Sequence, residues 1–541
     1  MLYNASRGMN MQKSRFDEKE MLNTKQAAIF LGVSTKTIYR MEEKGLINPT
    51  RTPGGQRRFH KDILEKYLKK SIYINAPQNP SKFKIKESET PYLFDNNLLI
   101  NNAIDYKINT LEKQITSDSP FNHKEHYANE ITPRQWVEEW DFKTYQTKTY
   151  SHGFHPYPAM FIPQVARKLI LAFSNEGDIV CDIFCGSGTT LIESSLLNRN
   201  SIGIELNPLA VLIAKVKTTP IEPERLTANL KQVINDFNKK NQIEPPSFKN
   251  IEFWFSKKVI KELSRLKYAI RNLNDEHSRN FFYVCFSELV RIVSFTRHGE
   301  FKLFRSPDKL TDKFNPEVIG EFIKICEKNI LGMKEYFKDV SNISNVRIIE
   351  GDATKNNGIP YNSIDFIITS PPYGDSRTTV AYGQFSRLSA QWLDLLPSDT
   401  IDIDKILLGG KNNVSLNDPI LNESETLKTS IETISNKDIN RAKDVLSFYI
   451  DLNKSLKQAH KILKNQKYFC LIVGNRTVKE LTLKTDSIVC EFAEKIGFVS
   501  QGILYRNIPN KRMPLKNSPT NEVGKTGFTM QKESIILLKK L

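Results

Sequence analysis

The segment DIVCDIFCGSGTT at residues 178–190 constrains the fold of this chain more than any other. It places a short apolar strand directly before a loop that contains Gly186 and Gly188. Glycine lets a backbone turn sharply and approach a ligand closely, and the run that follows is typical of a helix. A second strand-like run, SIGIE, ends at Glu205, 23 residues after Asp182. Because acids about 20 residues beyond such a loop reach ribose hydroxyls in dinucleotide-type folds, this spacing predicts a nucleoside-binding α/β domain.

The loop departs from two common phosphate-binding patterns. It is not GxGxxG, and it lacks the lysine of a P-loop, so NAD and ATP are both disfavoured as ligands. Cys181 and Cys185 flank the end of the first strand without a second pair of ligands nearby, and we therefore expect no metal site.

The chain of 541 residues is long enough for three to four domains at about 150 residues each. Strand and helix patterns alternate twice, which predicts an α/β fold with a mostly parallel sheet, divided by a helical insertion. The predicted segments are a disordered N-terminus at 1–20, a small helical domain at 21–70, a linker at 71–130, the first α/β part at 131–220, the helical insertion at 221–345 and the second α/β part at 346–541. Within the last part, the polar stretch at 408–438 is predicted to be a loop.

Charge and composition indicate the kind of partner and the compartment. The net charge of +17 favours a polyanion, nucleic acid first. Residues 1–70 carry a net charge of +8 and residues 501–541 carry +6, so most of the excess lies in two segments. Apolar runs such as YFCLIV at 468–473 are far shorter than a membrane helix, and the N-terminus resembles no signal peptide. Together with six scattered cysteines, these features predict a cytoplasmic protein.

The N-terminal segment has the layout of a helix-turn-helix followed by a wing. Thr24 is predicted to cap the first helix, Gly32 to make the turn and Ser34 to cap the second helix. Gly54 and Gly55 suit a hairpin tip. In this arrangement the second helix enters the major groove and wing arginines meet phosphates. The predicted DNA contacts are Ser34, Thr35, Lys36, Thr37, Tyr39 and Arg40 on the second helix, and Arg51, Arg57 and Arg58 on the wing.

This segment resembles the winged helix-turn-helix of the MerR and excisionase families, and its most specific part is RTPGGQRRF at residues 51–59. The resemblance implies a DNA-binding domain. It does not imply ligand sensing, because the long dimerisation helix that follows in MerR regulators is missing.

The segment DFIITSPPYG at residues 365–374 carries the chemistry. Methylation of an exocyclic amine needs a nitrogen lone pair that is freed from ring conjugation and aimed at the methyl donor. The Ser370 hydroxyl and the Pro371 carbonyl can accept the amine hydrogens, Pro371 and Pro372 hold that carbonyl rigidly, and Tyr373 offers a ring for stacking with a flipped base. No strong base is required, and alignment at about 3 Å would supply the rate.

With the glycine loop, this motif resembles bacterial DNA amino-methyltransferases that use S-adenosylmethionine, over residues 136–541. The resemblance implies that residues 152–170 pack beside the cofactor, that Glu205 and Asn207 lie on its ribose side and that Asp352 lies beside its adenine. The family usually carries proline where this chain has Ile183. The cofactor-binding residues implied are Asp182, Phe184, Cys185, Gly186, Ser187, Gly188, Thr189, Thr190, Glu205, Asn207 and Asp352. Near the C-terminus, Lys511 and Arg512 are candidate phosphate contacts.

In this family SPPY is associated with the N4 amine of cytosine, and Asp- or Asn-PPY with the N6 amine of adenine. The resemblance therefore implies a site-specific cytosine-N4 methyltransferase of double-stranded DNA, in a restriction-modification or other defence system, with a restriction endonuclease as a possible separate partner. An adenine-N6 enzyme, an RNA guanine-N2 enzyme and a DNA-binding regulator with an inactive domain stay open. Cytosine-C5 chemistry is excluded, because none of the six cysteines follows a proline.

Two further features concern recognition and packing. The stretch RIVSFTRHGEFKLFR at 291–305 interleaves basic residues with phenylalanine and is a candidate for target recognition, with 408–438 as its rival. His152 and His155 are expected to pack or to lie at a substrate edge.

Overall fold

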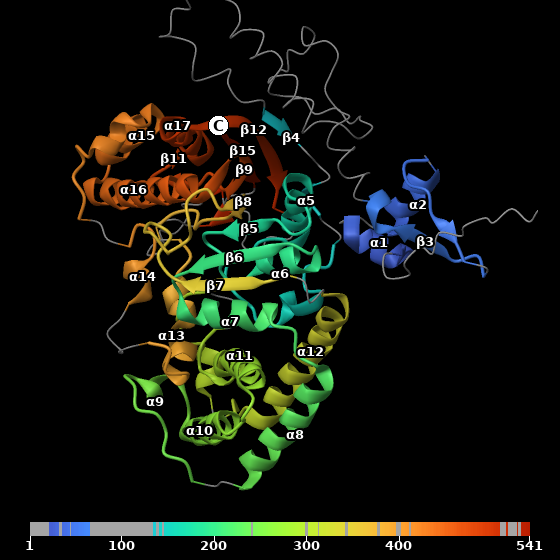
Figure 1. Ribbon diagram of the computed structural model, residues 1–541. Coiled ribbons are helices and arrows are strands. Elements are labelled where there is room, and N and C mark those ends of the chain that lie inside the picture. The colour runs from blue at the N-terminus through green and yellow to red at the C-terminus, as the bar shows by residue number, and fades with distance from the viewer. Residues whose placement is uncertain are drawn as a thin grey trace, which may run out of the picture. The chain divides into compact units, whose positions relative to one another are not determined.

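The computed structural model arranges the chain as two compact units, Met1–Ser117 and Asp118–Leu541 (Figure 1). The structure describes residues 21–31, 35–43, 45–52, 54–64, 134–136, 140–142, 145–239, 242–297, 301–311, 313–340, 344–375, 379–396, 402–410, 413–508, 516–517, 527–528 and 532–541. The predicted N-terminal disorder at 1–20 and the predicted linker at 71–130 lie outside these residues.

Within its described residues, the N-terminal unit combines two helices with a small antiparallel sheet. The helices are α1 (Thr24–Leu31) and α2 (Thr35–Glu43), and the strands are β1 (Met21–Asn23), β2 (Thr50–Arg51) and β3 (Arg57–His60), in the order β1-β3-β2. Ala27, Ile38, Met41 and Phe59 are among its buried side chains. Helix, helix and hairpin therefore share one apolar core.

The start of α1 differs from the prediction. The Gln26 N–H donates to Asn23 Oδ1 over 2.9 Å, and the Asn23 N–H donates to Gln26 Oε1 over 3.0 Å. This reciprocal pair is a capping box, which satisfies two backbone donors at the helix start. Asn23 therefore takes the capping place that the sequence suggested for Thr24.

The second unit is built on an eight-stranded sheet (Figure 1). In spatial order the strands are β4 (Arg134–Trp136), β12 (Phe498–Asn507), β15 (Lys532–Lys540), β9 (Leu463–Val473), β8 (Ile364–Thr369), β5 (Ile179–Asp182), β6 (Asn200–Glu205) and β7 (Val346–Glu350). Strands β5 to β9 run parallel, β4 is parallel to β12, and β15 is antiparallel to both of its neighbours. The prediction of an α/β fold with a mostly parallel sheet is confirmed.

The order of the strands reverses beside β5. From β5 the chain passes through α6 (Thr189–Leu196) to β6 and later to β7, and then returns to β8 on the other side of β5. All six residues of β8 are buried, as expected for a parallel strand covered on both faces. In open α/β sheets, ligands bind at the carboxyl ends of the strands on either side of such a reversal in strand order. The topology therefore predicts a binding site at the carboxyl ends of β5 and β8.

Several helices surround this sheet (Figure 1). Besides α6 they are α5 (Pro163–Phe173), α7 (Pro208–Thr218), α13 (Tyr382–Trp392), α14 (Ile403–Ile406), α15 (Glu425–Ser435), α16 (Ile439–Ile462) and α17 (Thr485–Ile496), with short 3-10 turns η4 (Tyr150–Gly153), η5 (Pro307–Leu310) and η6 (Pro419–Asn422). Two-residue strands form the pairs β10 (Thr477–Val478) with β11 (Leu481–Thr482) and β13 (Lys516–Asn517) with β14 (Gly527–Phe528).

Between α7 and β7, the described residues form five α-helices. They are α8 (Pro223–Lys239), α9 (Ile251–Trp254), α10 (Lys257–Arg271), α11 (Glu276–Val293) and α12 (Val318–Asp339). Figure 1 shows α8, α10, α11 and α12 gathered beyond α7, at the β7 side of the sheet. Trp392, at the end of α13, is fully buried and contacts the rings of Phe248, Phe255 and Phe286 edge to face. The insertion is thus joined to α13, the helix that follows the SPPY segment.

Residues 408–438 contain a helix where the sequence predicted a polar loop. Leu427, Ile431 and Ile434 follow the spacing of one face of α15 and are buried. Ser424 accepts a hydrogen bond from the Leu427 N–H over 3.0 Å and so caps the helix. The prediction was wrong because the many Asn, Ser and Thr residues of this stretch outweigh a short apolar face.

Candidate active site

The carboxyl ends of four strands meet at one cavity of about 490 Å³. Asp182 ends β5, Glu205 ends β6, Asp352 follows β7 and Ser370 follows β8, and all four line the cavity. Parallel strands bring their carboxyl ends to the same edge of a sheet, so residues as far apart as 182 and 370 become neighbours. The predicted residues in its wall are Asp182, Phe184, Cys185, Gly186, Ser187, Thr189, Glu205, Asp352, Ser370 and Pro372.

Five of the predicted cofactor-binding and catalytic residues lie outside this wall, namely Gly188, Thr190, Asn207, Pro371 and Tyr373. Asn207 is fully buried, and its amide donates to Tyr157 Oη over 3.1 Å and to Ser386 Oγ over 2.7 Å, while its Oδ1 caps α7. Tyr157, which receives one of these bonds, itself lines the cavity. The structure gives Asn207 a supporting place, and its contact with a cofactor stays a prediction.

The loop after β5 depends on glycine at two turns and at one close approach. Gly186 has φ +50° and Gly188 has φ +87°, conformations that favour glycine. A Cβ at Gly203, on the neighbouring strand β6, would lie 2.7 Å from Cys185 Sγ and 2.8 Å from a Leu191 methyl carbon. Glycine at 203 therefore lets β6 pack directly against the loop, a requirement that the sequence motif did not reveal.

Both carboxylate oxygens of Asp182 accept hydrogen bonds from other residues of the protein. Its Oδ2 accepts from Thr190 Oγ1 over 2.6 Å, and its Oδ1 accepts from Thr369 Oγ1 over 2.5 Å and from the Phe184 N–H over 3.1 Å. Burial raises the pKa of Asp182 to about 6, although these hydrogen bonds oppose the rise. Asp182 thus ties the glycine loop to the end of β8.

Glu205 holds the loop from the other side. Its Oε2 accepts from the Gly186 N–H over 3.0 Å, and its Oε1 accepts from the Asn207 N–H over 2.7 Å. Burial raises the pKa of Glu205 to about 7 against the effect of these bonds. The Leu206 N–H also bonds this carboxylate, and because a carboxylate has about four acceptor positions, some acceptor capacity remains for a ligand in the cavity.

Asp352 lies in a turn after β7. Its Oδ1 accepts from the N–H and the hydroxyl of Thr354, over 2.9 and 2.7 Å, and its Oδ2 lies 3.0 Å from Lys355 Nζ. Partial burial would raise the pKa of Asp352, but the bonds from Thr354 and Lys355 outweigh it and lower the pKa. This carboxylate is thus held ionised at the end of the cavity opposite β8.

A directed chain of hydrogen bonds fixes Ser370. Ser370 Oγ donates to Tyr373 Oη over 3.2 Å, and Tyr373 Oη donates to Glu533 Oε1 over 3.0 Å. The other oxygen of Glu533 pairs with the guanidinium of Arg506. Because a carboxylate only accepts, the hydrogen of Tyr373 is committed to Glu533 and the hydrogen of Ser370 to Tyr373. Ser370 therefore keeps its lone pairs for the cavity.

The chain directly after SPPY is held by an ion-pair cluster that sequence reasoning missed. Asp375 is fully buried and lies 3.0 Å from Arg441 of α16 and 3.1 Å from Arg476, which follows β9. A Cβ at Gly374 would lie 2.1 Å from Arg476 Nη1, so glycine permits this contact. The partners of Asp375 stand 66 and 101 residues away in the chain, where no local pattern reveals them.

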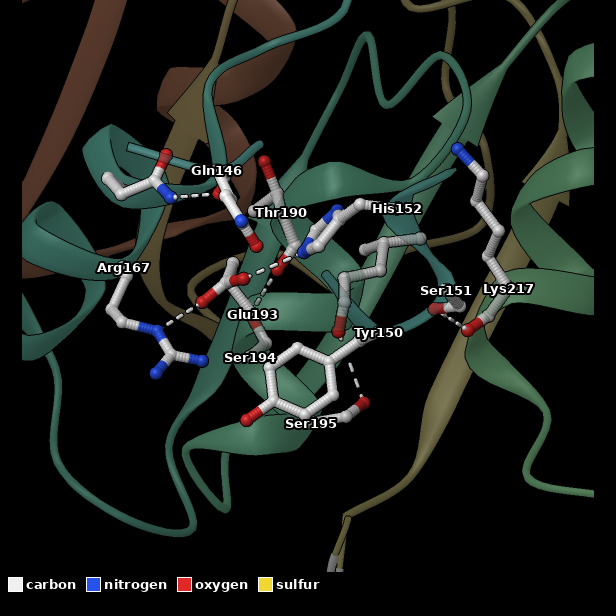
Figure 2. Close-up of polar contacts among 12 residues, drawn as sticks. Gln146, Tyr150, Ser151, His152, Arg167, Thr190, Glu193, Ser194, Ser195 and Lys217 are labelled. Carbon is white, nitrogen blue, oxygen red and sulfur yellow. Dashed lines mark hydrogen bonds and ion pairs between the residues drawn. The ribbon is translucent and has the colours of Figure 1, made fainter. Parts of the chain in front are cut away.

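Beneath the loop, buried polar side chains join η4, α5 and α6 (Figure 2). Glu193 Oε1 lies 2.8 Å from His152 Nε2, and Glu193 Oε2 pairs with the guanidinium of Arg167. Burial would raise the pKa of Glu193, but Arg167 and His152 outweigh it and lower the pKa. Glu193 belongs to α6, the helix that directly follows the glycine loop. The network therefore holds this helix, and with it the end of the loop, in place.

His155 lies in the same layer. Its Nδ1 donates to the Pro156 carbonyl over 2.7 Å, and burial lowers its pKa to about 3, so the imidazole stays neutral. Both histidines are buried, which agrees with the packing role expected for them.

The predicted DNA contacts of the N-terminal unit are placed only in part. Ser34 lies outside the described residues, as do Lys511 and Arg512 near the C-terminus, and only the backbone is described at Lys36 and Thr37. On α2, Thr35, Tyr39 and Arg40 are exposed. Arg58 of β3 is half-buried.

Two arginines of the wing form ion pairs with the second helix. Glu42 of α2 lies 3.0 Å from Arg51 and 2.5 Å from Arg57, and the Arg57 guanidinium lies 4.9 Å from the centre of the Tyr39 ring. Glu42 was not among the predicted residues, and it fixes the wing against the helix.

No helix in the described ranges is long and apolar enough to cross a membrane. The same residues contain no group of three or more His, Cys, Asp or Glu side chains that could hold a metal ion.

Comparison with known proteins adds sequence relatives to this geometry. The N6/N4 methyltransferase family model, described as DNA methylase, matches residues 8–216. The type II methyltransferase M.MvaI of Kocuria varians is 41% identical over 425 residues, which cover 74% of this chain and 93% of that protein. The type II methyltransferase M.MjaII of Methanocaldococcus jannaschii is 42% identical over 84 residues, or 16% of each chain. A solved SAM-dependent methyltransferase of Methanosarcina mazei, 10% identical, covers 72% of this chain and 99% of its own with a TM-score of 0.25, too low to bear on function.

Proposed function

The chain belongs to the N6/N4 family of DNA methyltransferases, which use S-adenosylmethionine, and we propose that it methylates the N4 amine of cytosine at a specific sequence in double-stranded DNA. The observation that carries this proposal is the directed hydrogen bonding of Ser370 at the wall of the cavity. A hydroxyl that has committed its hydrogen presents only acceptors, and an exocyclic amine presents two donors.

The chemistry follows from this complementarity. The Ser370 oxygen and the Pro371 carbonyl each accept one hydrogen of the amine, which draws the nitrogen toward a tetrahedral geometry and frees its lone pair. The rigid Pro371-Pro372 pair holds the carbonyl, and the ion pairs of Asp375 hold the chain behind it. Rate then comes from alignment of the amine with the methyl group, and no strong base is needed.

The cofactor half of the cavity fits S-adenosylmethionine in size and polarity. A volume of about 490 Å³ lies in the ordinary range for small-molecule sites. Glu205 would accept the ribose hydroxyls at its free acceptor positions, and Asp352 would lie beside the adenine. When bound, S-adenosylmethionine supplies an electrophilic methyl group on a positively charged sulfur.

We assign target recognition to two facing stretches of the helical insertion, 295–297 and 301–306, which are called the hairpin below. They pair at an antiparallel bridge between Thr296 and Arg305, and Phe301 and Phe304 are 42% and 49% exposed. The Arg305 guanidinium lies 4.3 Å from the centre of the Phe253 ring, which is 48% exposed. Aromatic and basic side chains together suit contacts with bases and phosphates.

The hairpin also contacts the helix that follows the SPPY segment. The Leu303 N–H donates to Gln384 Oε1 over 3.2 Å, and the ring of Phe301 lies 6.3 Å from that of Phe385 in α13. Tyr382, at the start of α13, lines the cavity. A base pair engaged by the hairpin would therefore be close to the catalytic residues.

Replacement of Phe304 by alanine tests the hairpin. We expect Phe304→Ala to raise the KM for duplex DNA about tenfold while the affinity for S-adenosylhomocysteine stays unchanged. Phe337→Ala is the matched control, since Phe337 is 44% exposed on α12. Equal effects of the two variants would exclude the hairpin from recognition.

For the N-terminal unit we propose a separate DNA-binding role, either anchoring the enzyme on DNA or repressing its own promoter. Deletion of residues 1–70 should then leave kcat on short duplexes unchanged. A deletion variant that is folded but inactive would mean that this unit belongs to the catalytic machinery. A restriction endonuclease that acts separately on the same sequence is the partner expected for such an enzyme.

The base is tested by digestion of methylated duplex DNA to nucleosides. After incubation with the full chain and S-adenosylmethionine, mass spectrometry should detect 4-methylcytosine. A product that contains only 6-methyladenine would contradict the base assignment, and methylation of tRNA but not of duplex DNA would favour RNA guanine-N2 chemistry instead.

A further inference from the structure

One side of the cavity opening is formed by residues 403–410, which include the short helix α14. Residues 405–408 line the cavity. Of the described side chains in the cavity wall, two large apolar ones are exposed, Met160 and Ile406. Ile406 is 48% exposed, whereas Leu408, two residues later, is buried. The end of α14 therefore presents an isoleucine to solvent where the cavity opens.

α14 is fixed to the start of α13. Asp404 Oδ1 accepts from the Gly383 N–H over 2.8 Å, and Asp404 Oδ2 accepts from the Gln384 N–H over 3.1 Å. The side chain of Gln384 accepts in turn from the Leu303 N–H of the hairpin over 3.2 Å. Gln384 thus connects α14 with the hairpin to which target recognition is assigned, so the two elements keep a fixed spacing.

The other end of the segment packs against the chain that follows SPPY. Gly409 has φ +66°, and a Cβ there would lie 3.1 Å from Asp375 Cβ and 2.9 Å from Phe448 Cβ of α16. A Cβ at Gly410 would lie 2.5 Å from the carbonyl oxygen of Lys405. Glycine at both positions permits this close packing. The place of Ile406 is therefore fixed from both ends of a short segment.

The charged side chains that are most exposed in the cavity wall are lysines. Lys405, next to Ile406, is 71% exposed, and Lys355 and Lys454 are exposed too. Each of the three pairs with an acid three residues earlier in the chain that is less exposed than the lysine. Positive charge thus faces solvent around the opening, which suits the phosphates of a nucleic acid.

A base that leaves the duplex to be methylated also leaves a gap between its former neighbours, and unstacking and unpairing it cost free energy. Proteins that open or kink DNA insert apolar side chains between base steps. Isoleucine suits this role because it is branched at Cβ and keeps essentially one rotamer in a helix, so it loses little freedom on insertion. We propose that Ile406 enters the space that the target nucleotide leaves in the duplex, and that Lys405 binds a phosphate beside it. The inference rests on the proposed methylation of an extruded base, but not on which base it is.

A substrate in which the target pair is already broken tests this role. The two substrates are a short duplex with the methylated motif and the same duplex with an abasic site opposite the target base. Single-turnover methylation by Ile406→Ala should be about tenfold slower than by the wild type on the paired duplex, and within about twofold of it on the abasic duplex. Equal slowing on both duplexes, or on neither, would overturn the proposal. If the mark is 6-methyladenine, the same two duplexes are built around that adenine, so failure of the base assignment leaves this test intact.

Two variants serve as controls for this experiment. Ile439→Ala is the matched one, because Ile439 is 58% exposed at the start of α16 and lies outside the cavity wall, and it should methylate both duplexes at wild-type rates. Met160→Ala tests the other exposed apolar side chain of the wall. A defect confined to the paired duplex in Met160→Ala, and absent in Ile406→Ala, would contradict the proposal. Ile406→Ala should also keep the melting temperature and the affinity for S-adenosylhomocysteine of the wild type, because the side chain is exposed.

The phosphate contact has its own readout. Lys405→Met should weaken binding to duplexes with and without the motif alike, and should lower the slope of log affinity against log salt concentration by about one. Lys428→Met is the matched control, because Lys428 is exposed on α15, lies outside the cavity wall and pairs with an acid three residues earlier, as Lys405 does. An unchanged slope in Lys405→Met would exclude the phosphate contact.

Insertion itself is observed by fluorescence. In Ile406→Trp, the added indole should be quenched when the full chain binds a duplex with the motif, because it then stacks between bases, and not when it binds a duplex without the motif. Ile439→Trp corrects for the four native tryptophans and for an indole elsewhere on the surface. Equal fluorescence of Ile406→Trp with the two duplexes would show that residue 406 stays outside the stack and would overturn the proposal.

Discussion

The proposed cofactor half of the cavity, at the ends of β5 and β6, and its proposed base half, after β8, hold their polar side chains in different ways. Asp182 and Glu205, at the ends of β5 and β6, accept hydrogen bonds mostly from residues of the contiguous segment 182–207, and in one case from Thr369 at the end of β8. Ser370, after β8, is fixed through Tyr373 by Glu533, which stands 160 residues beyond Tyr373 on β15. The first half is thus built largely from one contiguous segment, and the second depends on the assembled sheet.

This difference predicts different consequences of mutation. In the cofactor half the ligand-binding groups also hold the loop together, so substitutions there should reduce both stability and binding. In the base half the hydroxyls carry little of the fold, so substitutions there should reduce the rate and leave stability and cofactor binding intact.

The largest effect is expected from Asp182→Ala. The substitution leaves the buried hydroxyls of Thr190 and Thr369 without their acceptor, whereas the Phe184 N–H keeps Thr369 Oγ1 as an acceptor. At about 1–3 kcal/mol for each of these two buried donors, the free energy of unfolding should fall by about 2–6 kcal/mol, and binding of S-adenosylhomocysteine should be lost. Urea denaturation and calorimetry measure the two effects. Normal stability in this variant would show that Asp182 contacts the cofactor without supporting the loop.

Ser370→Ala should have the next largest effect, and on the rate alone. Loss of a preorganised polar contact to the reacting group lowers kcat by about 100-fold, equivalent to about 2.7 kcal/mol. The free energy of unfolding and the affinity for S-adenosylhomocysteine should match those of the wild type. Single-turnover methylation of a short duplex measures the step, and a variant that is fully active would remove Ser370 from the mechanism.

The affinity of the proposed cofactor half for a nucleoside ligand should depend on pH. Burial raises the pKa of Glu205 to about 7, so this group is protonated in the free protein below that pH and cannot accept both ribose hydroxyls. The affinity for methylthioadenosine should therefore fall about tenfold from pH 8 to pH 6, and Glu205→Gln should flatten the profile. An unchanged profile in Glu205→Gln would assign the titration to another group.

Tyr373→Phe should give the smallest change. It removes the acceptor of the Ser370 hydrogen, and the Ser370 hydroxyl is then free to rotate and to present its hydrogen to the amine. The loss of one directing hydrogen bond should lower kcat by about fivefold to tenfold without changing cofactor affinity. A drop as large as that of Ser370→Ala would mean that the Tyr373 hydroxyl does more in the reaction than orient Ser370.

The parts of the cavity that could be predicted from the sequence are those formed by contiguous motifs. The loop at 182–190 and the segment 370–373 are contiguous motifs, and the parallel strands that precede them follow from their apolar runs. Glu533 and the arginines that bind Asp375 act through contacts between distant segments, and nothing in their immediate sequence distinguishes them from surface charges. The helix α15 was missed for the opposite reason, because its apolar face is short and surrounded by polar residues.

The central claim is that Ser370 presents a cytosine amine for methylation. Single-molecule sequencing of total DNA from cells that express the wild-type chain, or Ser370→Ala at equal level, tests it most directly. We predict 4-methylcytosine at one sequence motif with the wild type and none, or a trace, with Ser370→Ala. A motif marked by 6-methyladenine, or 4-methylcytosine at equal density with both proteins, would contradict the account.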